Sequence, residues 1–147
     1  MAPTPNFPLF LTNLVVTWAL FGLIWTIQLV HYPSFRYIDD FSAFHQHHTS
    51  SITLIVMPLM LLELMTSAWL AWQMHFQLTW ILLLLLVLFI WGITFFWAIP
   101  VHQALSQEVT PAGITELILA NWPRTLLWSA KAGWLSWLAY GFWYTRT

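Results

Sequence analysis

The chain has 147 residues, of which 60% are hydrophobic and only 6% are charged, and its formal net charge is −1. Because a soluble domain has about 25% charged residues, this chain lacks the charge needed to cover a soluble globule. The near-neutral balance also excludes a basic patch, so we expect no nucleic-acid partner. Cysteine is absent, which excludes disulfides, thiolate metal sites and cysteine nucleophiles. The composition therefore predicts an integral membrane protein whose first partner is the lipid bilayer.

Four apolar segments are long enough to cross a bilayer core, which takes about 20 residues. They cover about 9–31, 52–73, 78–99 and 123–144. The helix of the second segment should begin earlier, near residue 41, because Asp40 and Ser42 are good N-caps. Short connections make neighbouring spans antiparallel. The sequence therefore predicts an all-α fold, an up-down four-helix bundle in a single transmembrane domain over residues 1–147.

Prolines suggest where these helices end. Tyr32-Pro33 should end the first span, because a proline disfavours the helical conformation of the residue before it. Pro100 should end the third span in the same way, just before His102. Pro58 lies inside the second span, where we expect it to kink the helix or to free a backbone carbonyl.

The approach to the last span carries two signals for a helix start. Thr110-Pro111 is a cap followed by a first-turn proline, and Asn121 with Pro123 repeats that pattern. A short helix at the membrane interface, over about 112–120, is therefore expected before the last span begins.

Most polar groups lie at one end of the predicted bundle, opposite the N-terminus, which we call the histidine end. The up-down topology places there His31, His45, His47, His48, His102, Asn121 and Arg124. Of the six histidines only His75 falls at the other end. Random placement would distribute these residues over both ends, so the clustering is the main indication of function.

Helical periodicity, about 100° per residue, groups the polar side chains of each helix on one face. His45 and Glu63 are 18 residues, or about five turns, apart and therefore share a face. The three stripes further contain Asn13, Thr17, Gln28 and His31; His48, Thr49, Thr66 and Ser67; and Asn121, Arg124, Trp128 and Lys131. Because polar stripes avoid lipid, we expect them to face one another inside the bundle.

Glu63 and Lys131 are the charged residues that lie well inside the predicted spans. A charge at mid-bilayer is costly and is usually paired with another group in the bundle interior. Their predicted depths below the histidine end differ by only about 5 Å at 1.5 Å per residue. We therefore predict a Glu63–Lys131 pair within the membrane, formed directly or through a water.

The histidines suggest a metal site, because imidazole is the commonest protein ligand for copper, iron and zinc. His45 and His48 are one helical turn apart, so both can reach one ion, and His31 and His102 would join them from the flanking helices. Asp39, Asp40 or a water would complete the ligand set. His47 and His75 are expected to have no such role.

Three alternatives to this metal ion are open. Two of the four histidines could instead be axial ligands of a haem, with Arg124 near a propionate. His45-Gln46-His47-His48 is similar to the histidine boxes of di-iron membrane desaturases and hydroxylases, but its spacing departs from theirs. The histidines could also do no more than hydrogen-bond lipid headgroups or helix ends.

A further resemblance lies in the first half of the chain. Tyr32-Pro33-Ser34-Phe35, Phe44-His45 with His48, and Pro58-Leu59-Met60 with Glu63 resemble a group of small four-span bacterial integral membrane proteins of unassigned function. The resemblance implies a four-span fold in a bacterial inner membrane. It implies no activity.

The function expected first is redox or oxygen chemistry on a lipid-soluble molecule at the histidine-ligated metal or haem. Glu63 would be a buried acid or proton relay, and Arg124 and Lys131 would bind anions or pair with acids. The second hypothesis is a non-catalytic subunit or assembly factor of a larger membrane complex, or a homo-oligomer. A transporter is less favoured, because the polar stripes are sparse.

Overall fold

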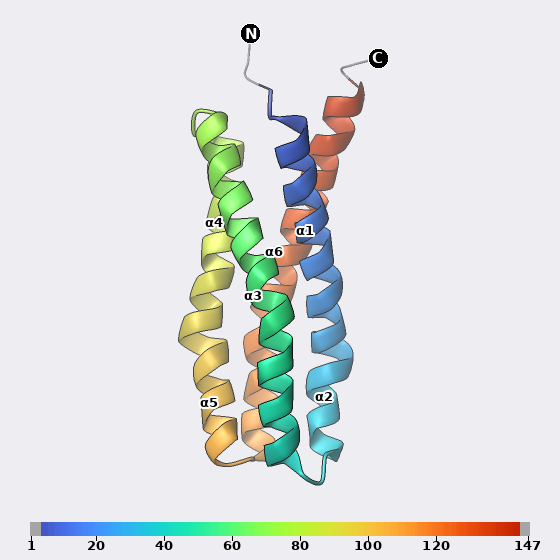
Figure 1. The fold of residues 1–147 in the computed structure, drawn as a ribbon, viewed down its shortest axis with the longest axis vertical. Helices are drawn as coiled ribbons and strands as arrows, with labels where there is room; N and C mark the ends of the chain where they lie inside the picture. The colour runs from blue at the N-terminus through green and yellow to red at the C-terminus, as the bar shows by residue number, and fades with distance from the viewer. Residues whose placement is uncertain (1–3, 145–147) are drawn as a thin grey trace.

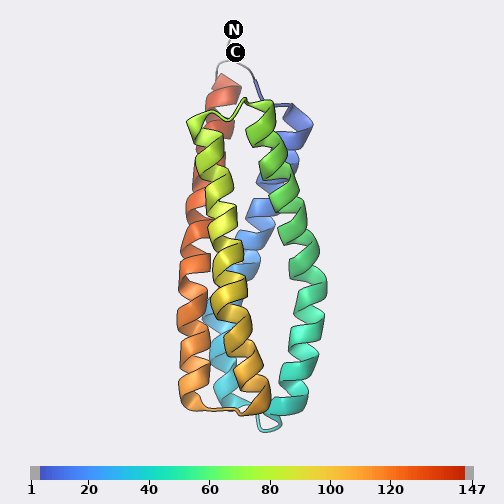
Figure 2. The same ribbon diagram turned by 90° about the vertical axis from the view of Figure 1, so that its left-hand side faces the viewer.

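The structure is a computed structural model that describes residues 4–144, with side chains up to residue 142. Helix accounts for 91% of it, and no strand occurs in the described part. Four helical stretches run antiparallel to their neighbours along one long axis (Figures 1 and 2). The start of α1 and the end of α6 lie at one end of the bundle, and two short connections lie at the other. The predicted all-α class is therefore confirmed.

The first stretch changes its helical type along its length. α1 covers Phe7–Thr26, and Asn6 caps it by accepting a hydrogen bond from Leu9 N at 3.1 Å. A π-helical turn, η1 (Ile27–His31), follows it. The stretch then ends in α2 (Tyr32–Ser34) and the 3₁₀ turn η2 (Phe35–Tyr37).

The second stretch is the single helix α3, Phe41–Gln73. Asp40 is its N-cap and accepts from Ala43 N at 3.3 Å, which satisfies a backbone donor that the first turn would leave free. Pro58 lies inside α3 without interrupting it. The turn after α3 contains two residues with φ of 52°, His75 and Phe76.

The other half of the bundle repeats the pattern of the first stretch. α4 (Leu78–Ile93) passes into a π-helical turn, η3 (Thr94–Ala98), and then into α5 (Ile99–Gln107). α6 covers Pro111–Tyr144. Thr110 Oγ1 accepts from Gly113 N at 3.0 Å at its start.

The helices do not end at the two prolines where the sequence predicts an end. Tyr32 and Ile99, the residues before Pro33 and Pro100, are helical and donate their N–H to the carbonyl five residues back. This wider π turn gives the proline ring room that an α-turn lacks, because in an α-helix the ring clashes with the carbonyl four residues back. The predicted ends at Tyr32-Pro33 and Pro100 are therefore wrong.

The predicted interfacial helix is not separate from the last helix. Residues 112–120 belong to the continuous helix α6, which also contains Pro123. Asn121 does not cap a new helix. Its side chain instead donates to Gln28 Oε1 at 2.8 Å, so tertiary contacts use the group that the sequence assigned to a cap.

The outer faces of the bundle are apolar, and its interior holds a set of polar side chains among apolar core residues. Phe7–Tyr37, Phe41–Gln73 and Leu78–Gln107 are each long and apolar enough to cross a membrane. Large apolar side chains such as Leu54, Phe96 and Trp137 are exposed on the outer faces. The buried polar residues include Asn13, Thr17, Gln28, His45, His48, Glu63, Thr66, Ser67, Asn121, Arg124, Thr125 and Lys131. The three predicted stripes do face one another, since lipid-facing helices cannot place such groups outward without cost.

Candidate functional site: a histidine cluster above a buried ion pair

Four histidines meet at the histidine end, and we call His31, His45, His48 and His102 the histidine cluster. His31 ends η1, His45 and His48 lie one turn apart on α3, and His102 lies on α5. The rings meet in two pairs. His31 Nε2 is 2.7 Å from His48 Nδ1, and His45 Nε2 is 3.0 Å from His102 Nδ1. The predicted convergence of these four side chains is therefore present.

Polar partners hold the outer nitrogens of the second pair. The Tyr32 hydroxyl lies 3.0 Å from His102 Nε2, and Ser106 Oγ lies 3.2 Å from His45 Nδ1. These contacts fix the two rings in orientation, with His45 Nε2 and His102 Nδ1 facing each other. Within residues 4–142, His48 Nε2 is buried and has no hydrogen-bond partner.

The cluster is not preformed around one metal position. In the described part of the chain, no three side chains of His, Cys, Asp or Glu are gathered as ligands of one ion. Instead each ring nitrogen that faces inward contacts a nitrogen of its partner ring. Asp39 and Asp40, considered as further ligands, are exposed, as are His47 and His75.

Arg124 lies deeper in the bundle than the cluster does. Its side chain is buried, with a relative exposure of 6%. Nη1 donates to Asn121 Oδ1 at 3.2 Å, and the guanidinium carbon lies 5.5 Å from the centre of the Trp128 ring. The guanidinium is also within electrostatic range of the Tyr32 hydroxyl, so it borders the cluster.

The predicted ion pair is present and direct. Lys131 Nζ lies 2.8 Å from Glu63 Oε1, and both side chains are almost completely buried. Lys131 also donates to Thr17 Oγ1 at 3.0 Å and to Ser67 Oγ at 3.2 Å, so its three N–H groups all have acceptors. Glu63 accepts further bonds from Thr17 Oγ1 at 2.9 Å and Trp128 Nε1 at 3.0 Å. The charges thus compensate each other inside a complete hydrogen-bond network.

Sequence reasoning missed the role of Tyr32 and Ser106 in this site. Tyr32 was expected only to end the first span, together with Pro33. A usable signal was its spacing of four residues from Gln28, which places both on one face once the helix continues past Pro33. Ser106 follows His102 by four residues on α5. Their shared helix face could not be predicted while the helix was expected to end at Pro100.

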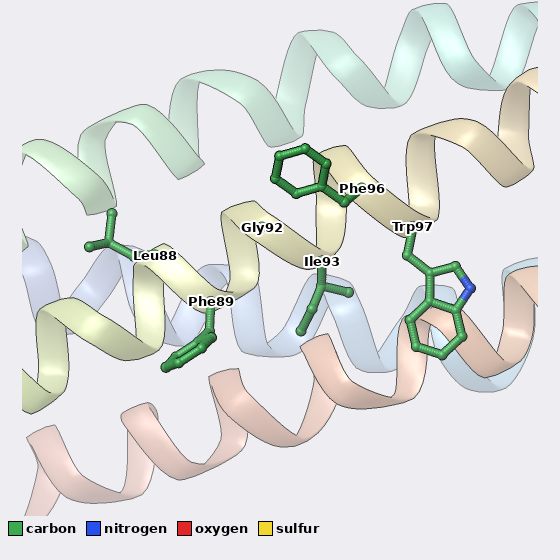
Figure 3. A pocket seen from close by; sticks show the side chains of 6 residues that line it. All are labelled: Leu88, Phe89, Gly92, Ile93, Phe96 and Trp97. Carbon is green, nitrogen blue, oxygen red and sulfur yellow. The ribbon is translucent and has the colours of Figure 1, made fainter.

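Two hollows adjoin the described residues. A shallow apolar groove of about 470 Å³ lies on the outer face of α4 and η3, with Gly92 between the side chains of Phe89 and Phe96 (Figure 3). A much smaller cavity of about 10 Å³ lies inside the bundle beside Arg124 and Trp128. The histidine rings are in direct contact in two pairs, so a haem would have to separate them to bind there.

Comparison with protein-family models, curated proteins and solved structures found no match to this chain.

Proposed function

We propose that this chain is an integral membrane protein whose histidine cluster binds one transition-metal ion: copper or iron, which would support redox or oxygen chemistry, or zinc, which would not. The observation that favours it is the pair His45 and His102, whose inner nitrogens face each other at 3.0 Å while Ser106 and Tyr32 hold the outer ones. Metal-bound histidines usually have their second ring nitrogen held in this manner. His48, with a buried nitrogen that lacks a partner among the described residues, supplies a further donor.

The distances between facing nitrogens are close to those of two ligands on one ion. Two nitrogens bound tetrahedrally at about 2.0–2.1 Å stand about 3.4 Å apart. The observed 2.7 and 3.0 Å contacts are slightly shorter, as expected where one ring donates its N–H to the other. Small ring movements would let an ion replace a proton in this space, so metal and proton compete for the same nitrogens.

A haem is less favoured than a single ion. The macrocycle would have to enter between rings that are in direct contact, and the neighbouring space is filled by Phe35, Phe41 and Phe44. Nitrogen ligands without thiolate favour copper, iron or zinc over calcium or magnesium. The position of the cluster at one end of a bundle with apolar outer faces supports a lipid-soluble substrate for the proposed redox or oxygen chemistry.

The remaining parts of the proposal concern the membrane. We place all four stretches across the bilayer, α6 included, because α6 is as long as its neighbours and packs against α1 and α4. A bacterial inner membrane is proposed from the resemblance of the first two spans. Glu63 and Lys131 compensate each other and serve as a buried acid–base pair below the metal.

Metal analysis and an optical spectrum of detergent-purified protein, never exposed to chelator, test the metal site. We expect about one ion per chain, lost in His45→Ala/His48→Ala. The matched control His47→Ala/His75→Ala removes two exposed histidines and should keep the metal. Wild-type protein without metal, or a cluster variant that retains it, would show that the proposal is wrong.

A second candidate function is a non-catalytic subunit of a larger complex or a homo-oligomer. The groove over α4 favours it, since Phe96 beside it is 88% exposed and Gly92 leaves open space for a neighbouring helix. Small residues permit close helix contact in membranes. Stoichiometric partners or a stable oligomer, purified without metal, would favour this candidate over the first.

A further inference from the structure

Arg124 is a buried cation whose charge no acid in the chain neutralises. All five carboxylate side chains belong to the described residues, and the ion pair found there joins Glu63 to Lys131. The polar groups next to its guanidinium, the Asn121 side chain and the Tyr32 hydroxyl, are not carboxylates. Arg124 Nε is buried and, among residues 4–142, has no hydrogen-bond partner. A buried guanidinium in this state is costly, because an unpaired charge loses its hydration without gaining a counter-charge.

A cavity lies directly beside this cation. Its volume is about 10 Å³, and Arg124 and Trp128 line it together with aliphatic side chains that include Leu20, Ile24 and Val56. A space of this size holds about one water-sized occupant. Since the Trp128 indole N–H already donates to Glu63, the guanidinium is the group that gives the cavity its charge.

We propose that this cavity binds one small inorganic anion, chloride in its common form, with Arg124 as the binding group. A water would complete the hydrogen bond of Nε but would leave the positive charge uncompensated. A monatomic anion accepts the hydrogen bond and also compensates the positive charge. The low dielectric of the bundle interior strengthens its attraction to the guanidinium. The ring of Trp128, packed against Arg124 at 5.5 Å, holds the guanidinium in place beside the cavity.

The size and lining of the cavity select the class of anion. Phosphate, sulfate and organic acids are larger than the space available, and their outer oxygens would have to lie against Leu20, Ile24 or Val56 without hydrogen-bond partners. Chloride is smaller than these anions and has no outer oxygens to leave unpaired, so it needs only small outward shifts of these aliphatic chains to fit beside the guanidinium. Arg124 borders the histidine cluster, but no histidine lines the cavity, so the anion would share no ligand with the proposed metal.

Anomalous diffraction from crystals of the wild-type protein grown in bromide tests the site directly. We expect one bromide peak beside Arg124 Nε, also in protein treated with chelator. In solution, the thermal midpoint in detergent should be higher in chloride than in gluconate at equal ionic strength. Arg124→Gln should abolish both effects, whereas Arg36→Gln, which removes an exposed arginine, should leave both unchanged.

Several outcomes would overturn the proposal. One is an absence of bromide at Arg124 in wild-type crystals, which would mean that water alone fills the cavity. Another is an equal midpoint in chloride and gluconate for the wild type. If Arg124→Gln does not fold, Arg124→Lys keeps the charge but loses the Nε donor, and its halide affinity should fall by at least about tenfold. Unchanged affinity in that variant would exclude Arg124 as the binding group.

Discussion

Replacing Lys131 by methionine should destabilise the bundle strongly, because it leaves Glu63 as a buried carboxylate without its counter-charge. The variant removes the 2.8 Å ion pair and the bonds to Thr17 and Ser67. Breaking a buried pair in this way costs about 3–5 kcal/mol. Glu63→Gln together with Lys131→Met removes both charges and keeps Trp128 paired, so we expect this double variant to lie within about 1.5 kcal/mol of wild type. The pair should therefore show a coupling free energy of at least about 1.5 kcal/mol.

The free energy of unfolding can be measured by SDS titration in mixed micelles, with circular dichroism as the probe. Arg36→Met is the matched control, because it removes an exposed cation and should change the free energy by no more than about 0.5 kcal/mol. A Lys131→Met variant as stable as Arg36→Met would refute the argument, since Glu63 would then need no counter-charge. The argument would also be refuted if the changes in unfolding free energy of Glu63→Gln and Lys131→Met simply added up to that of the double variant.

Two further predictions concern the ends of the bundle. Tyr32→Phe leaves His102 Nε2 without its 3.0 Å partner, so it should weaken metal binding by about 10–100-fold in chelator competition, and unchanged affinity would exclude an orienting role for Tyr32. His75→Gly should stabilise the fold by about 0.5–1 kcal/mol in the same SDS titration, because His75 holds φ at 52° and glycine adopts this conformation without steric cost. His75→Val, with a β-branched side chain, should do the opposite, and a stabilising effect of valine would contradict this explanation.

The interior of the bundle could be predicted because burial and periodicity act together. Exposing a polar side chain to lipid is costly, so a polar residue in a membrane helix faces the bundle interior. The positions of Glu63 and Lys131 on their stripes therefore predicted their pairing, which the structure contains. The same reasoning put His45 and His48 on the inward face and His47 outward. These predictions needed only the helical repeat and the cost of exposing a polar group to lipid.

The path of the backbone around proline could not be predicted in this way. Pro33 and Pro100 follow π turns, and nothing in the local sequence distinguishes a helix that ends from one that widens. Tertiary contacts next to the prolines favour continuation, since Tyr32, just before Pro33, hydrogen-bonds His102, just after Pro100. The partners of the cluster were missed for this reason, although its four histidines were found.

The two π turns also bear on how the cluster would accept an ion. His31 is the last residue of η1, and His102 lies in the first turn of α5, directly after η3. Each pair of the cluster therefore has one member in or one turn after a π turn and one on the regular helix α3. A π turn departs from the regular bonding pattern, and such turns are frequent at functional sites. The small ring movements that would replace the hydrogen-bonding proton by a metal can therefore come from His31 and His102, while His45 and His48 stay fixed on α3. Metal binding should accordingly shift the backbone amide signals of η1 and η3 more than those of α3, and the reverse pattern would show that the regular helix adapts instead.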